Sequence, residues 1–216
     1  MQKNHKKIAI VDYGCGNILS LSRAIEELGY DSELTKEQTK ILNSDLLILP
    51  GVGAFENAMK LLKSNNLIHT LNEYVKIKKK PLLGICLGMQ MLLSKSYEMG
   101  EHDGLDFISG EVISIKSKSK KRDIKIPHIS WNEILINNKD SDEILRKELI
   151  KKNFYFIHSF MSLTKEKKNT IAHCKYFDVE VPAIIRNGNV AGCQFHPEKS
   201  GRNGLNLLKN IIETLK

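Results

Sequence analysis

Two segments that lie far apart in the sequence carry side chains suited to nucleophilic chemistry. The first is Gly84 to Gly88, Gly-Ile-Cys-Leu-Gly, which follows an apolar run. A strand, then G-x-C-x-G, then a helix is the layout of a nucleophile elbow with cysteine in place of serine. Glycine on each flank removes the Cβ atoms that would collide in so sharp a turn. We expect the turn to project Cys86 into a site, where the following helix N-terminus would favour its thiolate.

The second segment supplies a base and a carboxylate. Residues 190–199 form an apolar run that ends in His196, Pro197 and Glu198 before a new helix. The unperturbed pKa of histidine, roughly 6.5, suits it to take a thiol proton and return it to a leaving amine. Proline fixes one backbone dihedral between His196 and Glu198, so both side chains can reach one place. A cysteine at the end of a buried strand is more often a core residue than a nucleophile, but together with His196 and Glu198 this cysteine predicts a catalytic triad.

Residues 84–90, GICLGMQ, and 194–200, QFHPEKS, closely resemble the class I (triad) glutamine amidotransferases. In that family the cysteine attacks the side-chain amide of glutamine, and ammonia and then glutamate leave through a thioester. The resemblance implies that Cys86 is the nucleophile, His196 the base and acid, and Glu198 the residue that orients His196. It also implies a three-layer, flavodoxin-like α/β fold with a mixed, mainly parallel central sheet.

Further segments, in the same order, are similar to the glutaminase subunits of imidazole glycerol phosphate synthases. Those subunits pass ammonia to a separate cyclase (synthase) subunit, which forms imidazole glycerol phosphate and AICAR in histidine biosynthesis. The resemblance therefore implies L-glutamine as substrate and a cyclase as heterodimer partner. The segments are VDYGCGNI from Val11, PGVGAF from Pro50, IPHISWNEI from Ile126, FIHSF from Phe156 and FHPEKSG from Phe195.

The loop after the second apolar run, Gly51-Val52-Gly53, lacks the Lys-Ser/Thr of a P-loop and the third glycine of a dinucleotide fingerprint. The resemblance implies that the Val52 N–H, with the N–H of Leu87, forms an oxyanion hole. Two such donors contribute about 3–4 kcal/mol each to lowering the barrier. Glycine beside Val52 would let that peptide rotate, as activation in the family requires. A plain strand-to-helix turn is the alternative.

The resemblance also implies residues that contact the substrate and the partner. Gln90, for which an ordinary helix residue is the alternative, lies four residues after the nucleophile, and Glu98 is expected near the substrate's amino group. The implied substrate-binding residues are Gly53, Gln90, Glu98, Ser159 and Phe160. The implied partner-facing residues are Asn17, Pro127, His128, Trp131, Asn132 and Lys199.

Three features of the partner-facing segments leave alternatives open. Trp131 is the only tryptophan, and a buried core tryptophan is the alternative. Ser130 stands where the family usually has glycine, and Phe160 where it usually has a tyrosine. These two departures loosen the assignment of the partner and leave the triad intact.

Alternating apolar and amphipathic segments through the first hundred positions predict β-α-β units and a parallel sheet. We expect strands over 7–11, 45–49 and 82–85. Helical spacing of apolar residues predicts one helix from Ile18 to Leu28 and another that includes Phe55, Met59 and Leu62. Each predicted functional loop then follows a strand.

The second half is expected to be mostly β and partly antiparallel. Alternating runs begin at residues 111, 129, 153 and 190, and helices are predicted over 140–149 and 203–215. The charged, low-complexity segment 116–125 is expected to be an exposed connection. The 216 residues suffice for one domain, 1–216, with a full core.

Composition excludes several classes of protein. Lysine and arginine exceed acidic residues by 33 − 25 = 8, in dispersed lysine runs without a nucleic-acid-binding motif, so solvated surfaces explain the charge and no nucleic acid partner is expected. The four cysteines fit neither a disulfide framework nor a zinc site. No metal or cofactor is implied. Without a signal-peptide pattern or a membrane-length apolar run, we expect a cytoplasmic protein.

Two rival functions stay open at this stage. One is a paralogous glutaminase that feeds ammonia to a sugar amidotransferase in surface-polysaccharide or nonulosonic acid biosynthesis. The other, from a different class, is a catalytically idle binding or scaffolding protein. Retention of Cys86, His196 and Glu198 argues against the idle protein, which has no chemical need for all three.

Overall fold

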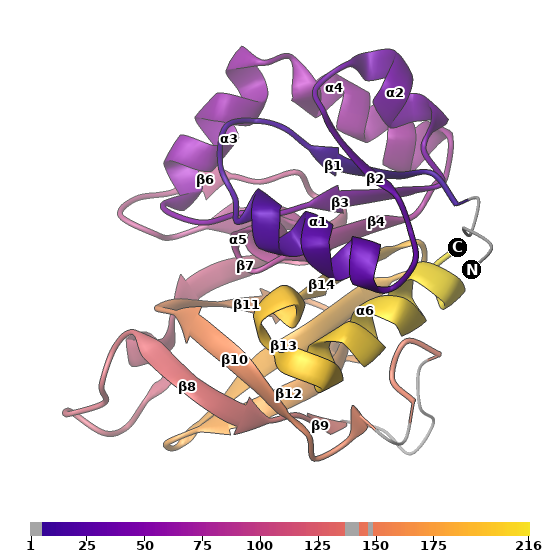
Figure 1. The fold of residues 1–216 in the computed structure, drawn as a ribbon. Helices are drawn as coiled ribbons and strands as arrows, with labels where there is room; N and C mark the ends of the chain where they lie inside the picture. The colour runs from indigo at the N-terminus through magenta and orange to yellow at the C-terminus, as the bar shows by residue number, and fades with distance from the viewer. Residues whose placement is uncertain (1–5, 137–142, 147–148) are drawn as a thin grey trace.

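Four short strands of buried, largely apolar residues form the centre of the main sheet in the computed structural model, which describes residues 6–136, 143–146 and 149–216 (Figure 1). Continuous apolar runs are typical of strands that are covered on both faces. These strands are β1 (Ile8–Val11), β3 (Leu46–Leu49), β4 (Leu82–Ile85) and β14 (Val190–Cys193).

The main sheet has eight strands in the order β2-β1-β3-β4-β14-β13-β12-β9. The pairings from β2 to β14 are parallel, and those from β14 to β9 are antiparallel. The predicted mixed, mainly parallel central sheet is thus confirmed. In doubly wound sheets of this strand order, ligands bind at the carboxyl ends of the parallel strands. The other strands are β2 (Ser32–Thr35), β9 (Leu135–Ile136), β12 (Thr170–Tyr176) and β13 (Val179–Asn187).

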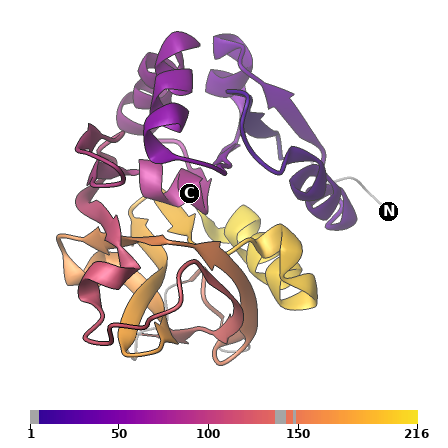
Figure 2. The ribbon, with the colours of Figure 1, turned by 90° about the vertical axis from the view of Figure 1, so that its left-hand side faces the viewer.

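Helices cover both faces of the parallel strands and complete three layers (Figures 1 and 2). One face packs against α1 (Ile18–Glu27) and the carboxyl-terminal α6 (Gly201–Thr214). The opposite face packs against the remaining helices. These are α2 (Gln38–Asn43), α3 (Phe55–Ser64), α4 (Leu67–Asn72), which continues as a π-helical turn over Glu73–Ile77, and α5 (Leu87–Met91).

Two smaller sheets lie beside the main one. The strands β8 and β10 form an antiparallel pair, and a second sheet has the order β11-β7-β5-β6. Their strands are β5 (Leu93–Ser96), β6 (His102–Asp103), β7 (Ile108–Ser114), β8 (His128–Glu133), β10 (Asn153–His158) and β11 (Phe160–Thr164). Single 3₁₀ turns occupy Ile115–Lys118, Lys167–Asn169 and Pro197–Lys199.

The predicted elements of the first half are present, but β2, α2, α4 and β5 were not anticipated. The strand β2 is an edge strand with only Thr35 buried, so its sequence lacks a strong apolar pattern. The helix predicted over 140–149 falls partly outside the described residues, and residues 143–144 form a turn, with a bend at 145, instead. The segment 116–125 is mostly exposed, as predicted. Within the described part of the chain, no helix is long and apolar enough to span a membrane.

Candidate active site

The turn between β4 and α5 holds Cys86 in an unusual backbone conformation. Its φ is 55° and its ψ is −111°, which a side-chain-bearing residue adopts only where the surroundings impose it. A Cβ atom on Gly84 would lie 2.7 Å from the Gly88 carbonyl group. One on Gly88 would lie 1.9 Å from the Leu49 oxygen. Both glycines are therefore required by close backbone approach, as the predicted elbow demands.

His196 and Glu198 form a buried pair next to Cys86. The His196 Nδ1 atom lies 2.8 Å from Glu198 Oε1, and the two side chains are only 4% and 3% exposed. Asn17 Nδ2 donates to the same carboxylate oxygen at 3.5 Å. Burial lowers the pKa of His196, but hydrogen bonds to Cys86 and Glu198 outweigh burial and raise that pKa to about 10. The raised pKa favours the imidazolium form of His196.

A cavity of about 490 Å³ opens over the cysteine. It gathers residues from the loop after β3, the β4–α5 turn and α5, the loop after β5, the β10–β11 connection and the segment after β14. Of the predicted residues, Glu198 lies behind His196, and Asn17, His128, Trp131 and Asn132 are outside the lining. The lining residues are Val52, Gly53, Cys86, Leu87, Gln90, Glu98, Met99, Pro127, Ile157, His158, Ser159, Phe160, His196 and Lys199.

Two of the predicted substrate-binding side chains are already held by the protein. Gln90 Nε2 donates to the Phe160 carbonyl and to Gln194 Oε1, each at 3.0 Å. Glu98 Oε2 accepts the backbone N–H of Phe55 at 2.8 Å, at the first residue of α3. Both side chains are thereby oriented at the cavity, and their contacts with glutamine stay predictions.

Tyr13, which the sequence analysis did not single out, anchors the loop predicted to form the oxyanion hole. Its hydroxyl donates to the Pro50 carbonyl at 2.7 Å, immediately before Gly51. Burial raises the pKa of Tyr13, so it remains a donor. Val52, two residues on, is 43% exposed and lines the cavity. The loop is thus held by a hydrogen bond at Pro50, and at Val52 it is exposed and faces the cavity.

The strand pair β8–β10 presents apolar side chains beside the cavity mouth. Ile129 and Ile157 are paired in register and are 53% and 39% exposed. Trp131 is 54% exposed and packs on Tyr155 with ring centroids 5.8 Å apart. The alternative of a core tryptophan therefore does not hold. We call Ile129, Trp131 and Ile157 the β8–β10 patch.

His128, also predicted to face the partner, is fully buried. Its ring stacks on Tyr176 with centroids 3.9 Å apart, and its Nδ1 lies 3.1 Å from His158 Nε2. His158 Nδ1 lies 2.7 Å from the Phe160 carbonyl, which can only accept, so Nδ1 carries the proton. Burial, together with the His128 ring, lowers the pKa of His158 to about 3. His128 can therefore affect a partner interface only indirectly, through the residues that pack against it.

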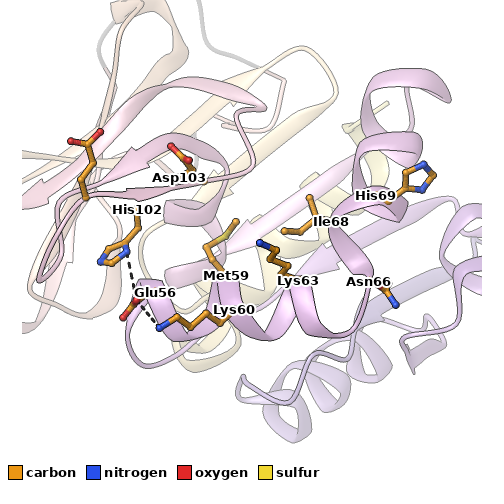
Figure 3. Close-up of a pocket in the computed structure, with 11 residues that line it drawn as sticks. Glu56, Met59, Lys60, Lys63, Asn66, Ile68, His69, His102 and Asp103 are labelled. Atoms are coloured by element: carbon orange, nitrogen blue, oxygen red, sulfur yellow. Dashed lines mark ion pairs between the residues drawn. The ribbon is translucent and has the colours of Figure 1, made fainter.

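A second, larger hollow of about 660 Å³ lies between α3, α4 and β6 (Figure 3). Its floor includes Met59 and Ile68, and Lys60 pairs with Glu56 at 2.7 Å. Among the described residues that line it there is no predicted site residue, cysteine or serine. Groups of three or more residues able to hold a metal ion do not occur in the described residues. The candidate active site is therefore the smaller cavity over Cys86.

A family model described as glutamine amidotransferase class-I matches residues 9–214, nearly the whole chain. The chain belongs to the class I glutamine amidotransferases. Its curated relatives agree with this family. A protein of Carboxydothermus hydrogenoformans named imidazole glycerol phosphate synthase subunit HisH is 44% identical over 206 residues, covering 95% of this chain and 98% of that one. The protein named HisH 1 of Legionella pneumophila (strain Paris) is 42% identical over 210 residues, with the same coverage.

Solved structures of related proteins share the fold at lower identity. The structure of PurLQS from Thermotoga maritima has a TM-score of 0.71 and 19% identity, over 98% of this chain and 99% of that chain. A glutamine amidotransferase from Thermotoga maritima has a TM-score of 0.62 and 16% identity, over 98% of this chain and 84% of that chain. The predicted flavodoxin-like amidotransferase fold is confirmed.

Sequence reasoning overlooked Tyr13, His158 and Gln194. Gln194 lies in the segment QFHPEKS and His158 in FIHSF, but an amide or a buried histidine shows no chemistry by residue type alone. Tyr13 could have been found from its place directly after a strand that ends at the sheet edge where the other site loops lie.

Proposed function

We propose that this chain is the glutaminase subunit of an imidazole glycerol phosphate synthase. In this proposal it hydrolyses glutamine through Cys86, His196 and Glu198 and passes ammonia to a cyclase subunit in histidine biosynthesis, in the cytoplasm. The observation that carries the proposal is 41–44% identity to HisH subunits along almost the full length of both chains. The geometry around Cys86 supports the chemistry.

The first half-reaction forms a thioester. The Cys86 thiolate attacks the carboxamide carbon of glutamine, and the N–H groups of Val52 and Leu87 hold the resulting oxyanion. His196, whose raised pKa keeps it protonated, gives its proton to the departing nitrogen, so that ammonia leaves and a glutamyl thioester remains. Glu198, bonded to His196 Nδ1, keeps Nε2 directed at the reacting atoms.

The second half-reaction regenerates the enzyme. His196, now neutral, takes a proton from water as the water oxygen attacks the thioester carbon. The C–S bond then breaks, glutamate leaves, and Cys86 and His196 return to the thiolate and imidazolium forms. One glutamine and one water yield one glutamate and one ammonia.

The β8–β10 patch supports a protein partner at the cavity mouth. Three large apolar side chains exposed on adjacent strands form the kind of surface that protein association buries. Ile157 belongs both to this patch and to the cavity lining, and Pro127, directly before β8, lines the cavity as well. A cyclase seated there would cover the site from which ammonia leaves.

Reconstitution tests the proposal. The chain is mixed with candidate cyclase subunits from the same genome, and formation of imidazole glycerol phosphate and AICAR is followed with glutamine as the nitrogen donor. Product from glutamine supports the histidine-pathway assignment. A different pair of results would move the chain to the paralogous pathway. These are no product with any cyclase, and glutamine-dependent amidation of a nucleotide-linked sugar when a sugar amidotransferase is supplied.

A further inference from the structure

A fully buried glutamine lies beside the proposed nucleophile. Gln194 precedes His196 by two residues, and its side chain has no exposed surface. Its Nε2 atom lies 3.8 Å from the Cys86 sulfur, within hydrogen-bonding distance for sulfur. Its backbone N–H donates to the Ala183 carbonyl at 2.9 Å, which fixes where the side chain begins. A buried amide must find its partners within the protein, so these contacts decide its orientation.

The orientation of the Gln194 amide can be deduced from the Phe160 carbonyl, to which it is linked through Gln90. The Phe160 carbonyl can only accept, so Gln90 presents Nε2 to it. The same Nε2 atom lies 3.0 Å from Gln194, which must then present Oε1. Gln194 Nε2 is left to face Cys86. The chain Phe160–Gln90–Gln194–Cys86 therefore ends in an N–H donor directed at the sulfur.

We infer that Gln194 is a positioning residue that holds and stabilises the Cys86 thiolate. The inference deepens the proposed function and rests on Cys86 being its nucleophile. Hydrogen bonds to an ionised group are about twice as strong as those between neutral groups. The backbone N–H of Cys86 is already bonded to the Cys193 carbonyl at 2.8 Å and does not serve the sulfur. His196 supplies one hydrogen bond to the sulfur, and Gln194 supplies another.

This role acts on turnover more than on glutamine affinity. The sulfur is anionic before attack and again when it leaves the thioester carbon, but it carries no charge in the thioester. A donor aimed at the sulfur therefore stabilises the start and the end of the cycle and sets the fraction of enzyme that is ready to attack. Removing it lowers kcat by more than it changes KM.

The test compares how the reactivity of Cys86 depends on pH. Wild-type protein and Gln194→Leu are treated with iodoacetamide across a pH series, and modification of the Cys86 peptide is measured by mass spectrometry. We expect the midpoint to rise by about one pH unit in Gln194→Leu, and kcat of the complex with its cyclase to fall about tenfold at pH 7, with KM within about twofold. Gln194→Glu keeps an acceptor for Gln90 but places oxygen against the sulfur, so its midpoint should rise further.

A buried amide elsewhere provides the matched control. Asn210 in α6 is 3% exposed and lies outside the cavity lining. Asn210→Leu removes a buried amide outside the cavity, and it should leave the Cys86 profile unchanged. If Gln194→Leu does not fold, the nearly isosteric Gln194→Glu decides the question by the same measurement.

The outcomes separate this inference from the proposed function. An unchanged alkylation profile in a folded Gln194 variant overturns the positioning role, even if that variant is less stable. If complete alkylation of Cys86 leaves glutamine hydrolysis intact, Cys86 is not the nucleophile and the proposed function itself is overturned.

Discussion

His196 Nδ1 lies 2.8 Å from Glu198 Oε1, although the two residues are separated only by proline. The 3₁₀ turn Pro197–Lys199 brings Glu198 back toward the histidine, and both side chains are almost fully buried. A carboxylate in this position holds the imidazole in one tautomer, with Nε2 free for the sulfur. The backbone turn at Pro197–Lys199 therefore places the carboxylate that fixes where the His196 ring carries its proton.

Replacement of the carboxylate should lower the pKa of His196. In the wild-type protein hydrogen bonds to Cys86 and Glu198 raise that pKa to about 10, so His196 remains protonated throughout the neutral range. Glu198→Gln removes the carboxylate partner, and NMR titration of the His196 ring should show a lower midpoint. A wild-type midpoint near 6.5 would contradict this account. We expect glutaminase turnover in Glu198→Gln to fall less than in Cys86→Ala, because Glu198 does not enter the covalent chemistry.

The elbow should tolerate no side chain at position 88. A Cβ there would lie 1.9 Å from the Leu49 oxygen, so Gly88→Ala must displace backbone, and we expect a loss of about 3 kcal/mol or failure to fold. Gly188→Ala is the control, because Gly188 has a φ of +58° but open space around it. Its cost is about 1 kcal/mol, from the left-handed conformation alone. Equal losses in urea denaturation would refute the close-approach argument.

Removal of the Trp131 ring should weaken partner binding and leave the fold intact. Trp131 is 54% exposed in the β8–β10 patch, and tryptophan often dominates the energy of an interface. We expect Trp131→Ala to weaken binding to the cyclase by about tenfold or more in calorimetry. Ile77→Ala, at another exposed apolar position on the π-helical turn after α4, should leave the affinity unchanged. Equal effects of the two changes would place the interface elsewhere.

Stability should fall as the pH drops below about 6.5. The pKa of His158 is about 3 in the folded chain against roughly 6.5 in the unfolded chain, so folding favours its neutral form. Its contribution is complete above pH 6.5 and is lost toward pH 3, at up to about 1.4 kcal/mol per pH unit. His196 has the opposite sign, with its contribution complete below pH 6.5 and lost as the pH rises toward 10.

His158→Leu provides the comparison for this pH dependence. Urea denaturation of the wild type and the variant at pH 7.5 and pH 5 gives two differences in the free energy of unfolding. The loss of unfolding free energy between pH 7.5 and pH 5 should be smaller in the variant, because the variant lacks the His158 contribution. The carboxylates and His196 contribute to both proteins. An identical difference in the two proteins would show that His158 titrates in the folded chain as it does in the unfolded one.

Sequence reasoning recovered the parts of the fold that depend on apolar pattern. The buried strands β1, β3 and β4 and the helices α1, α3 and α6 follow directly from it. The edge strand β2 and the short helix α2 lack that pattern and were missed. The pairing of β8 with β10 depends on contacts between distant segments, which no local signal records.

The same distinction applies to the candidate site. Cys86 and His196 could be predicted because residue type and flanking glycine or proline disclose their chemistry, and the structure brings both to one cavity. The roles of Gln194 and Tyr13 depend on where the fold places them, which residue type does not reveal. Gln194 faces the Cys86 sulfur, and Tyr13 donates to the Pro50 carbonyl. The burial of His128 was equally hidden, because it depends on the Tyr176 ring from another strand.

Cys86→Ala, assayed as a complex with the cyclase, tests the central claim most directly. Formation of imidazole glycerol phosphate is measured for wild type and variant, first with glutamine and then with ammonium salt as the nitrogen source. The account predicts that Cys86→Ala loses glutamine-dependent synthesis almost completely and keeps ammonium-dependent synthesis near the wild-type rate. Glutamine-dependent synthesis by Cys86→Ala at the wild-type rate would contradict it.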